Sequence, residues 1–317
     1  MDSIIKSIYE GKTLTEGEGR TLFEAIFEGK VAPVALAGIL TALKMRGEKP
    51  EEIAGAAAAM RGAALPVPRP EGLTIGEIVG TGGDGTQSIN ISTTAAIAAA
   101  AAGLFIAKHG NSGVSSRSGA SDVLTSLGFD IKATPEESAK LLKDTGFAFC
   151  YAKLYHPAMR FAGPVRAELK TRTIFNILGP LTNPAHPDYA VIGVYSPALL
   201  ETVANVLKLQ GMRRAFVVHG AGADEAVALT AALLGSRGRE PMKRPYTAKP
   251  STRNSALTAR SAAAPLRRRT SVLKRPTAWT TLRAAAPKKT RRASSIFWAA
   301  RANPPTAPSW PPTLRCF

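Results

Sequence analysis

The sequence has few of the residues that build disulfide frameworks, metal clusters or membrane spans. Only two of its 317 residues are cysteines, Cys150 and Cys316, and their spacing suits neither a zinc site nor a redox dithiol. Cys150 lies in the apolar run 147–151, so we expect it to be a small buried hydrophobic residue. The longest apolar run, 95–107, is too short for a transmembrane helix, which needs about 20 residues. The N-terminus lacks a basic segment followed by an apolar stretch, so we expect a cytoplasmic protein with no signal peptide and no membrane partner.

Acidic residues are almost missing from the last quarter of the chain. The formal net charge is +18, yet residues 232–317 contain 19 of the 41 basic residues and only one of the 23 acids, Glu240. Residues 1–231 are therefore neutral overall, which excludes a protein that is basic over its whole surface. The segment 232–317 also contains 11 of the 23 prolines and few large apolar residues. Such a composition cannot bury enough apolar surface to offset the entropy of ordering, so we expect an irregular basic tail.

Helix signals dominate residues 1–70. Asp2 and Thr15 are suitable N-cap residues, and Pro33 and Pro50 are suitable first residues of helices. Apolar residues recur at helical spacing between these signals. The sequence therefore predicts a small N-terminal helical subdomain of four short helices.

Short apolar strands alternate with helices in residues 71–231. We expect strands at 75–79, 104–108, 147–151, 189–194 and 214–219. We expect helices at 92–102, 119–127, 135–145, 156–169 and 197–210. This alternation favours an α/β fold with a mainly parallel sheet flanked by helices, in which ligands bind at the carboxyl ends of the strands. The domain would be incomplete, and its residues 156–184 could also pack on the helical subdomain.

Three polar loops fall at the places where such a sheet binds ligands. Residues 80–85 form a glycine-rich turn, residues 90–94 begin a helix with Ser and Thr, and residues 108–122 combine two cations with serines and glycines. Each loop alone has an ordinary explanation as a tight turn, a helix N-cap or a solvated loop. Together their backbone amides, hydroxyls and cations are typical of a polyphosphate site. His109 could act as a base, but we expect a strand-end histidine whose hydrogen bonds are satisfied.

In order and spacing, these loops resemble the phosphoribosyl pyrophosphate site of anthranilate phosphoribosyltransferases, which share a fold with nucleoside phosphorylases. The resemblance continues through residues 156–160, 164–166 and 172–184 and ends at 219–225. It implies transfer of the phosphoribosyl group from phosphoribosyl pyrophosphate to the amine of anthranilate, in tryptophan biosynthesis. It also implies a magnesium-dependent glycosyltransferase that forms a homodimer through the helical subdomain. No single catalytic residue is expected, because the aromatic amine is an adequate nucleophile and positioning and electrostatics supply the catalysis.

The resemblance also implies roles for particular residues. The residues that would hold phosphoribosyl pyrophosphate are Gly80, Gly83, Asp84, Ser88, Asn90, Ile91, Ser92, Thr93, Lys108, His109, Gly110, Asn111, Ser112, Gly113, Val114, Ser115, Ser116 and Ala120. Those that would contact anthranilate are Gly80, Asn111 and Arg166. Two magnesium ions would be ligated by Ser92, Asp224 and Glu225, since adjacent carboxylates supply the hard oxygen ligands that Mg²⁺ prefers.

The resemblance stops at about Thr230. Its sudden loss, with the loss of acids and the rise in Arg, Ala, Pro, Thr and Ser, is what a GC-rich gene read in the wrong frame produces. We hypothesise a frameshift near codon 230, and then expect this chain to have little or no activity. Two alternatives stay open: a relative of this fold that binds nucleic acid through its basic tail, and a pyrimidine nucleoside phosphorylase.

Overall fold

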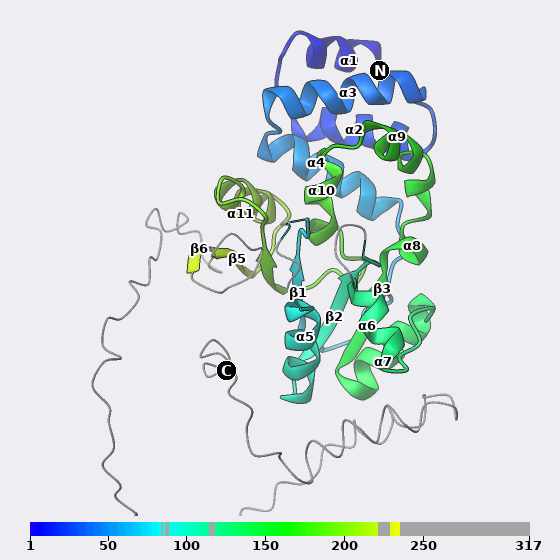
Figure 1. The fold of residues 1–317 in the computed structure, drawn as a ribbon, viewed down its shortest axis with the longest axis vertical. Coiled ribbons are helices and arrows are strands. Elements are labelled where there is room, and N and C mark those ends of the chain that lie inside the picture. Colours follow the sequence, from blue (N-terminus) through cyan, green and yellow to red (C-terminus); the bar gives the residue numbers. More distant parts are fainter. Residues whose placement is uncertain (84, 86–88, 114–117, 221–228, 235–317) are drawn as a thin grey trace, which may run out of the picture.

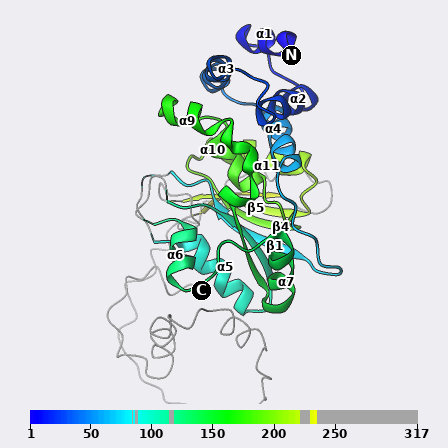
Figure 2. The same cartoon turned by 90° about the vertical axis from the view of Figure 1, so that its right-hand side faces the viewer.

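The computed structural model describes residues 1–83, 85, 89–113, 118–220 and 229–234. Within these residues a helical bundle stands on an α/β domain (Figure 1). Seen from the side, α5, α6 and α7 lie at the end of the molecule away from α1 and α3 (Figure 2). None of the described helices is long and apolar enough to cross a membrane.

The bundle consists of the four helices that the sequence predicts. They are α1 (Asp2–Tyr9), α2 (Glu16–Phe27), α3 (Pro33–Arg46) and α4 (Pro50–Gly62). Thr15 caps α2 in a capping box with Glu18, which confirms the predicted N-cap. The expectation that Asp2 caps α1 is wrong, because Met1 is the N-cap residue and Asp2 is the first helical residue. At that position the negative charge of Asp2 interacts favourably with the positive end of the helix dipole.

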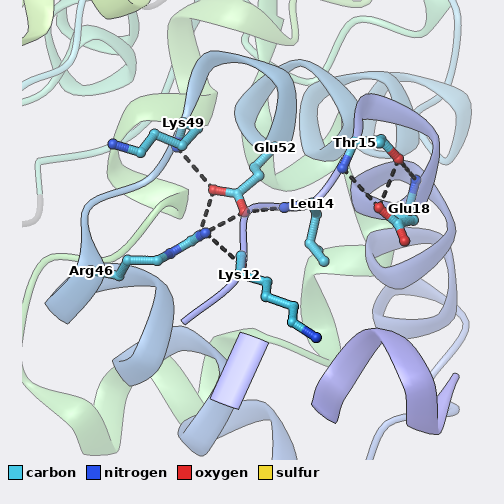
Figure 3. A network of polar contacts seen from close by, with 7 residues as sticks. All are labelled: Lys12, Leu14, Thr15, Glu18, Arg46, Lys49 and Glu52. Carbon is cyan, nitrogen blue, oxygen red and sulfur yellow. Dashed lines mark hydrogen bonds and ion pairs between the residues drawn. The ribbon is translucent and has the colours of Figure 1, made fainter. Parts of the chain in front are cut away.

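A buried ion pair ties the loops of this bundle together (Figure 3). The carboxylate of Glu52, in α4, is 1% exposed and lies 2.6 Å from a guanidinium nitrogen of Arg46, at the end of α3. It also accepts hydrogen bonds from the backbone amides of Leu14 (2.8 Å) and Lys49 (2.9 Å). The pair is therefore fully hydrogen-bonded at the carboxylate, which a buried charge requires.

The α/β domain contains a six-stranded sheet in the order β3-β2-β1-β4-β5-β6. Its strands are β1 (Ile75–Gly80), β2 (Phe105–Gly110), β3 (Phe147–Tyr151), β4 (Tyr189–Gly193), β5 (Arg214–Gly220) and β6 (Leu229–Leu234). The first five are parallel and lie where the sequence predicts them, which confirms the α/β fold with a mainly parallel sheet. Strand β6 was not predicted: its backbone pairs antiparallel with β5, so the expected start of the irregular tail at 232 falls inside a strand.

Four of the helices expected in this domain are confirmed. They are α5 (Ile91–Ala101), α6 (Ala120–Ser126), α7 (Pro135–Thr145) and α11 (Leu199–Leu209). The single helix expected at 156–169 is wrong. Pro157 and Pro164 lack the amide hydrogens that a continuous helix needs, so the chain forms separate short turns. These are α8 (Ala152–Tyr155), the 3₁₀ turn Pro157–Arg160 and α9 (Gly163–Leu169), followed by α10 (Phe175–Leu178) and a second 3₁₀ turn, Gly179–Leu181.

The segment that contains α9 and α10 lies against the bundle. The ring of Phe175 packs edge-on against Phe23 and Phe27 of α2, with centroids 5.8 Å and 6.2 Å apart. One apolar core therefore runs from the bundle through this segment to β4, β5 and α11. On the sheet itself, α7 packs against β2 and β3 on one face and α5 packs against β1 and β2 on the other.

Candidate functional site

The polar loops predicted from the sequence lie at one edge of the sheet, where the parallel strands end. The first loop follows β1. Gly82 and Gly83 adopt φ angles of 65° and 71°, which are left-handed conformations that favour glycine. The turn leaves the strand directly, because Thr81 donates its amide hydrogen to the carbonyl of Gly193 at the end of β4 (2.9 Å).

The second and third loops meet one another. Asn90 stands at the N-cap of α5 but forms no capping hydrogen bond with its side chain. Instead its amide nitrogen Nδ2 donates to the carbonyl of Ser118 in the third loop (3.3 Å). The helix start and the loop after β2 are therefore side by side, as a shared phosphate site requires.

The described residues on either side of 114–117 in the third loop meet at Asp122. This carboxylate accepts hydrogen bonds from the amides of Gly119 (2.6 Å) and Gly113 (3.1 Å), and these bonds lower the pKa of Asp122. A Cβ added to Gly119 would lie 2.8 Å from the carbonyl oxygen of Asn111, so only glycine fits there. We did not predict this role of Asp122. The signal was present, since an acid three residues after a glycine at a helix start can form this bond.

Two buried histidines, His109 at the start of the third loop and His156, contact one another. Nδ1 of His109 is 2.9 Å from the carbonyl oxygen of Gly179, and its Nε2 is 3.1 Å from Nε2 of His156. The carbonyl can only accept, so His109 carries its proton on Nδ1 and accepts from His156. Burial lowers the pKa of His109 to about 3 and that of His156 to about 4, so both rings are neutral near pH 7. Both ring nitrogens of His109 are engaged, which confirms the expected histidine with satisfied hydrogen bonds.

A buried carboxyl group lies on the same side of the sheet. Glu77, in β1, is 2% exposed and accepts the amide hydrogen of His109 (3.2 Å). Burial raises its pKa to about 8, although Asn183 and Lys108 act in the opposite direction. Lys108 is also buried and donates to the carbonyl of Ile78 (2.7 Å). Glu77 was missed from the sequence, although an acid at a buried position of a strand, between Ile75 and Val79, is an unusual pattern.

Arg166 lies on α9, at the junction with the bundle. Its guanidinium carbon is 5.1 Å from the ring centroid of Phe175, and burial lowers the pKa of Arg166. Within the described part of the chain no carboxylate pairs with this guanidinium. Asn111 is exposed at the end of β2, and its Oδ1 accepts the amide hydrogen of Ser112 (2.9 Å). A half-buried cation without an acidic partner can receive the carboxylate of a ligand.

Several predicted site residues lie outside the described residues. They are Asp84, Ser88, Val114, Ser115, Ser116, Asp224 and Glu225. Ser92 is described, in the first turn of α5. Within the described ranges, no group of three His, Cys, Asp or Glu side chains could hold a metal ion. The predicted magnesium ligands therefore depend on residues 224 and 225.

A cavity of about 210 Å³ lies at the opposite edge of the sheet. Its lining includes Arg61, Asp188 and Arg213, which precede strands or end a helix, and also Glu77 of β1, but no described residue of the three loops. We therefore do not assign the substrates to this cavity.

Comparisons with known proteins give one consistent answer. A model of the "Glycosyl transferase family, helical bundle domain" matches residues 2–64, and one of the "Glycosyl transferase family, a/b domain" matches residues 74–254. The anthranilate phosphoribosyltransferase of Vibrio cholerae is 52% identical over 225 residues, which cover 71% of this chain and 68% of the relative. About 90 residues at the C-terminus lie outside this match.

Solved structures agree with the sequence matches. The anthranilate phosphoribosyltransferase of Thermus thermophilus is similar with a TM-score of 0.69 and 47% identity over 73% of each chain. The enzyme of Saccharomyces cerevisiae in complex with phosphoribosyl pyrophosphate and Mg is similar with a TM-score of 0.67 and 32% identity, over 73% of this chain and 69% of the other.

Proposed function

The chain belongs to the anthranilate phosphoribosyltransferase family, and from this we propose how its own residues bind the substrates and promote the reaction. The activity is that of tryptophan biosynthesis: the phosphoribosyl group passes from phosphoribosyl pyrophosphate to the amine of anthranilate, and pyrophosphate leaves. One observation carries the assignment of the site. The three loops that the sequence singles out all emerge at the same edge of the parallel sheet, and two of them are hydrogen-bonded to each other.

The phosphoribosyl pyrophosphate is bound by these three loops. The turn at Gly80–Gly83 brings the backbone close to the ligand, the start of α5 offers the positive end of its dipole, and the third loop offers amides and hydroxyls. Asp122 holds Gly113 and Gly119 of the third loop by accepting their amide hydrogens.

Anthranilate is bound by Arg166, Asn111 and Gly80. The Arg166 guanidinium pairs with the carboxylate of the substrate, for which its planar geometry is suited. Its position on Phe175 keeps it at the junction between the bundle and the α/β domain. The amine of anthranilate would then face the ribose.

Two magnesium ions would be held by Ser92, Asp224 and Glu225 together with oxygens of the pyrophosphate. They would neutralise the charge that develops on the leaving pyrophosphate. Ser92 lies in the first turn of α5, whereas residues 224 and 225 follow β5 in the sequence and lie outside the described residues.

The protein's own residues contribute positioning and charge rather than proton transfer. His109 cannot act as a base toward the amine, because one ring nitrogen donates to Gly179 and the other accepts from His156. The reaction therefore proceeds through loss of pyrophosphate from C1 of the ribose, with attack by an amine that is held in place.

A second copy of the chain covers the bundle. Val34 and Met45 of α3 are 86% and 79% exposed, and Tyr9 of α1 is 55% exposed. Apolar side chains gathered on neighbouring helices are typical of a homodimer interface.

The C-terminal segment does not complete this enzyme. Phe216 of β5 is 44% exposed, on the face of the sheet that α5 covers over β1, β2 and β3. Domains are stable by only about 5–15 kcal/mol, and we expect the burial free energy lost with the covering elements to exceed this margin. We expect the 317-residue chain to aggregate and to be poorly active, and the same DNA read in a shifted frame to encode a balanced, helical C-terminus. A shifted frame full of stop codons would contradict the frameshift.

The activity is tested by the loss of anthranilate and the formation of its phosphoribosyl adduct, with and without Mg²⁺. The assay uses the full chain and a second protein from the frame-corrected gene. Magnesium-dependent turnover by either confirms the proposal. Phosphorolysis of thymidine or uridine with no turnover of anthranilate would indicate a nucleoside phosphorylase. Salt-dependent binding of DNA with no turnover by either protein would indicate a nucleic-acid binder.

A further inference from the structure

The turn at Gly80–Gly83 needs support from outside its own backbone. Gly82 and Gly83 are both left-handed, and the residues of the turn that follow Gly80, the last residue of β1, belong to no helix or strand. Glycine has the greatest conformational freedom of any residue, so such a turn is entropically costly to hold in one conformation. Contacts from other segments must therefore define where its amides point.

One end of the turn is fixed by the end of β4. The amide of Thr81 donates to the carbonyl of Gly193 (2.9 Å), and the hydroxyl Oγ1 of Thr81 accepts the amide hydrogen of Tyr195 (3.0 Å). Thr81 is thus held through both its backbone and its side chain.

The other end is held by Arg172. Its Nη2 donates to the carbonyl oxygen of Gly83, and its guanidinium carbon lies 4.2 Å from the ring centroid of Tyr195. The guanidinium therefore lies over the ring while its Nη2 reaches the turn. Arg172 and Tyr195 together form a clamp, which we call the Arg172–Tyr195 clamp.

The backbone on both sides of Arg172 is fixed as well. Thr171 accepts a hydrogen bond from Lys44 of α3 through its hydroxyl, and the amide of Thr173 donates to Oδ1 of Asn176 (3.0 Å). The preceding Lys170 has a φ of 48°, a left-handed conformation that turns the chain sharply after α9. The arginine thus extends from a rigid segment that is anchored on the helical bundle.

We infer that Arg172 and Tyr195 are positioning residues that hold the turn at Gly80–Gly83 in the conformation that receives phosphoribosyl pyrophosphate. This inference rests on the proposed function for the identity of the ligand, and on the described contacts for the clamp itself. Arg172 connects the phosphate turn to the segment that also carries Arg166. The clamp therefore keeps the turn at a fixed place relative to the proposed anthranilate residue.

The experiment has one measurement that needs no ligand and one that does. Hydrogen exchange of a peptide that contains residues 79–83 is measured without ligand, in the full-length chain and in the frame-corrected chain. Arg172→Ala should raise its exchange rate about tenfold, the size expected from losing one hydrogen bond from a charged donor. Tyr195→Ala should raise it in the same direction, whereas Tyr195→Phe keeps the ring and should leave it unchanged.

A matched control is Arg213→Ala. Arg213 also stacks on a tyrosine, with 5.4 Å between its guanidinium carbon and the ring centroid of Tyr189, but at the opposite edge of the sheet. Its loss should not change exchange at residues 79–83. Equal exchange in Arg172→Ala and the control, or faster exchange in both, would overturn the clamp.

The second measurement is the Kd of phosphoribosyl pyrophosphate with Mg²⁺, by titration calorimetry. Arg172→Ala should weaken binding about tenfold, with Arg213→Ala unchanged. Faster exchange with an unchanged Kd would refute a positioning role. If the unaltered chain and the frame-corrected chain both fail to bind the ligand, the proposed function fails, while the exchange data still decide whether the clamp holds the turn.

Discussion

Helices α2 and α4 of the bundle cross so closely that their backbones are in contact at Gly55. Replacing Gly55 by alanine tests whether the stability of the bundle depends on this contact. Gly55 lies in the middle of α4, where α4 crosses α2. A Cβ added there would lie 2.6 Å from the backbone nitrogen of Arg20 and 3.0 Å from the carbonyl carbon of Gly19. Neither atom belongs to a flexible side chain, so α2 and α4 themselves must separate.

The cost can be worked out from this geometry. To restore ordinary contacts the helices must move apart by roughly 0.5–1 Å, which already forfeits a quarter to a half of the dispersion attraction across a contact. Overpacking of this kind costs about 1–3 kcal/mol, while the exchange of a helical glycine for alanine returns about 0.5–1 kcal/mol. The contact brings together the buried Leu22, Phe23 and Ile53, so the loss extends beyond a single residue. We expect Gly55→Ala to destabilise the protein by about 2 kcal/mol.

Gly62→Ala, at the C-terminal end of the same helix, is the matched control. An added Cβ there meets no atom within 4 Å, so this variant should be neutral or slightly stabilising. Thermal unfolding followed by circular dichroism should give a lower Tm for Gly55→Ala, by roughly 2–4 °C per kcal/mol for a protein of this size. Equal melting temperatures for Gly55→Ala and Gly62→Ala would refute the close crossing of α2 and α4.

Three further predictions concern the site. Arg166→Ala should raise the KM for anthranilate far more than that for phosphoribosyl pyrophosphate, in a frame-corrected protein, and equal effects on both would contradict its assignment. Replacing Asp224 and Glu225 together by alanine should weaken the magnesium dependence of turnover with little change in Tm; an unchanged magnesium titration would show that they are not ligands. Burial raises the pKa of Glu77 from 4.5 to about 8, so the native state keeps a proton that the unfolded state releases. Its contribution to stability is present below about pH 4.5 and is lost as the pH rises to about 8; urea denaturation of Glu77→Gln should show no such loss, and an identical pH profile would argue against a buried carboxyl.

Local signals in the sequence predicted most of the fold. The capping box at Thr15 and the helix starts at Pro33 and Pro50 depend on residues three or four positions apart, which a sequence displays directly. The five parallel strands are mostly apolar, because both faces of such a sheet are largely buried. Three features failed: the N-cap expected at Asp2, the helix at 156–169, where the prolines were not given enough weight, and β6, whose pairing depends on β5 rather than on its own residues.

The site could be predicted only in part for a similar reason. The three loops have compositions that point to phosphate, so the sequence identified them one by one. The buried pair of His109 and His156 joins residues that are 47 positions apart, and the contact of Arg172 with Gly83 joins residues 89 positions apart. No local pattern in the sequence predicts contacts between residues so far apart. They become visible only when the sheet brings β1, β2 and the segment after α9 together.

Strand β6, which was not predicted, brings together the described residues on either side of the segment 221–228. In the pairing of β5 with β6, Gly220 lies opposite Leu229, so the two ends of the connection at 221–228 are adjacent. This connection leaves the carboxyl end of β5, the same edge at which the phosphate loops follow β1 and β2. Asp224 and Glu225 themselves lie outside the described residues, so their assignment as magnesium ligands stays a prediction. The described residues on either side of this segment, Gly220 and Leu229, both lie next to the edge at which the phosphate loops emerge.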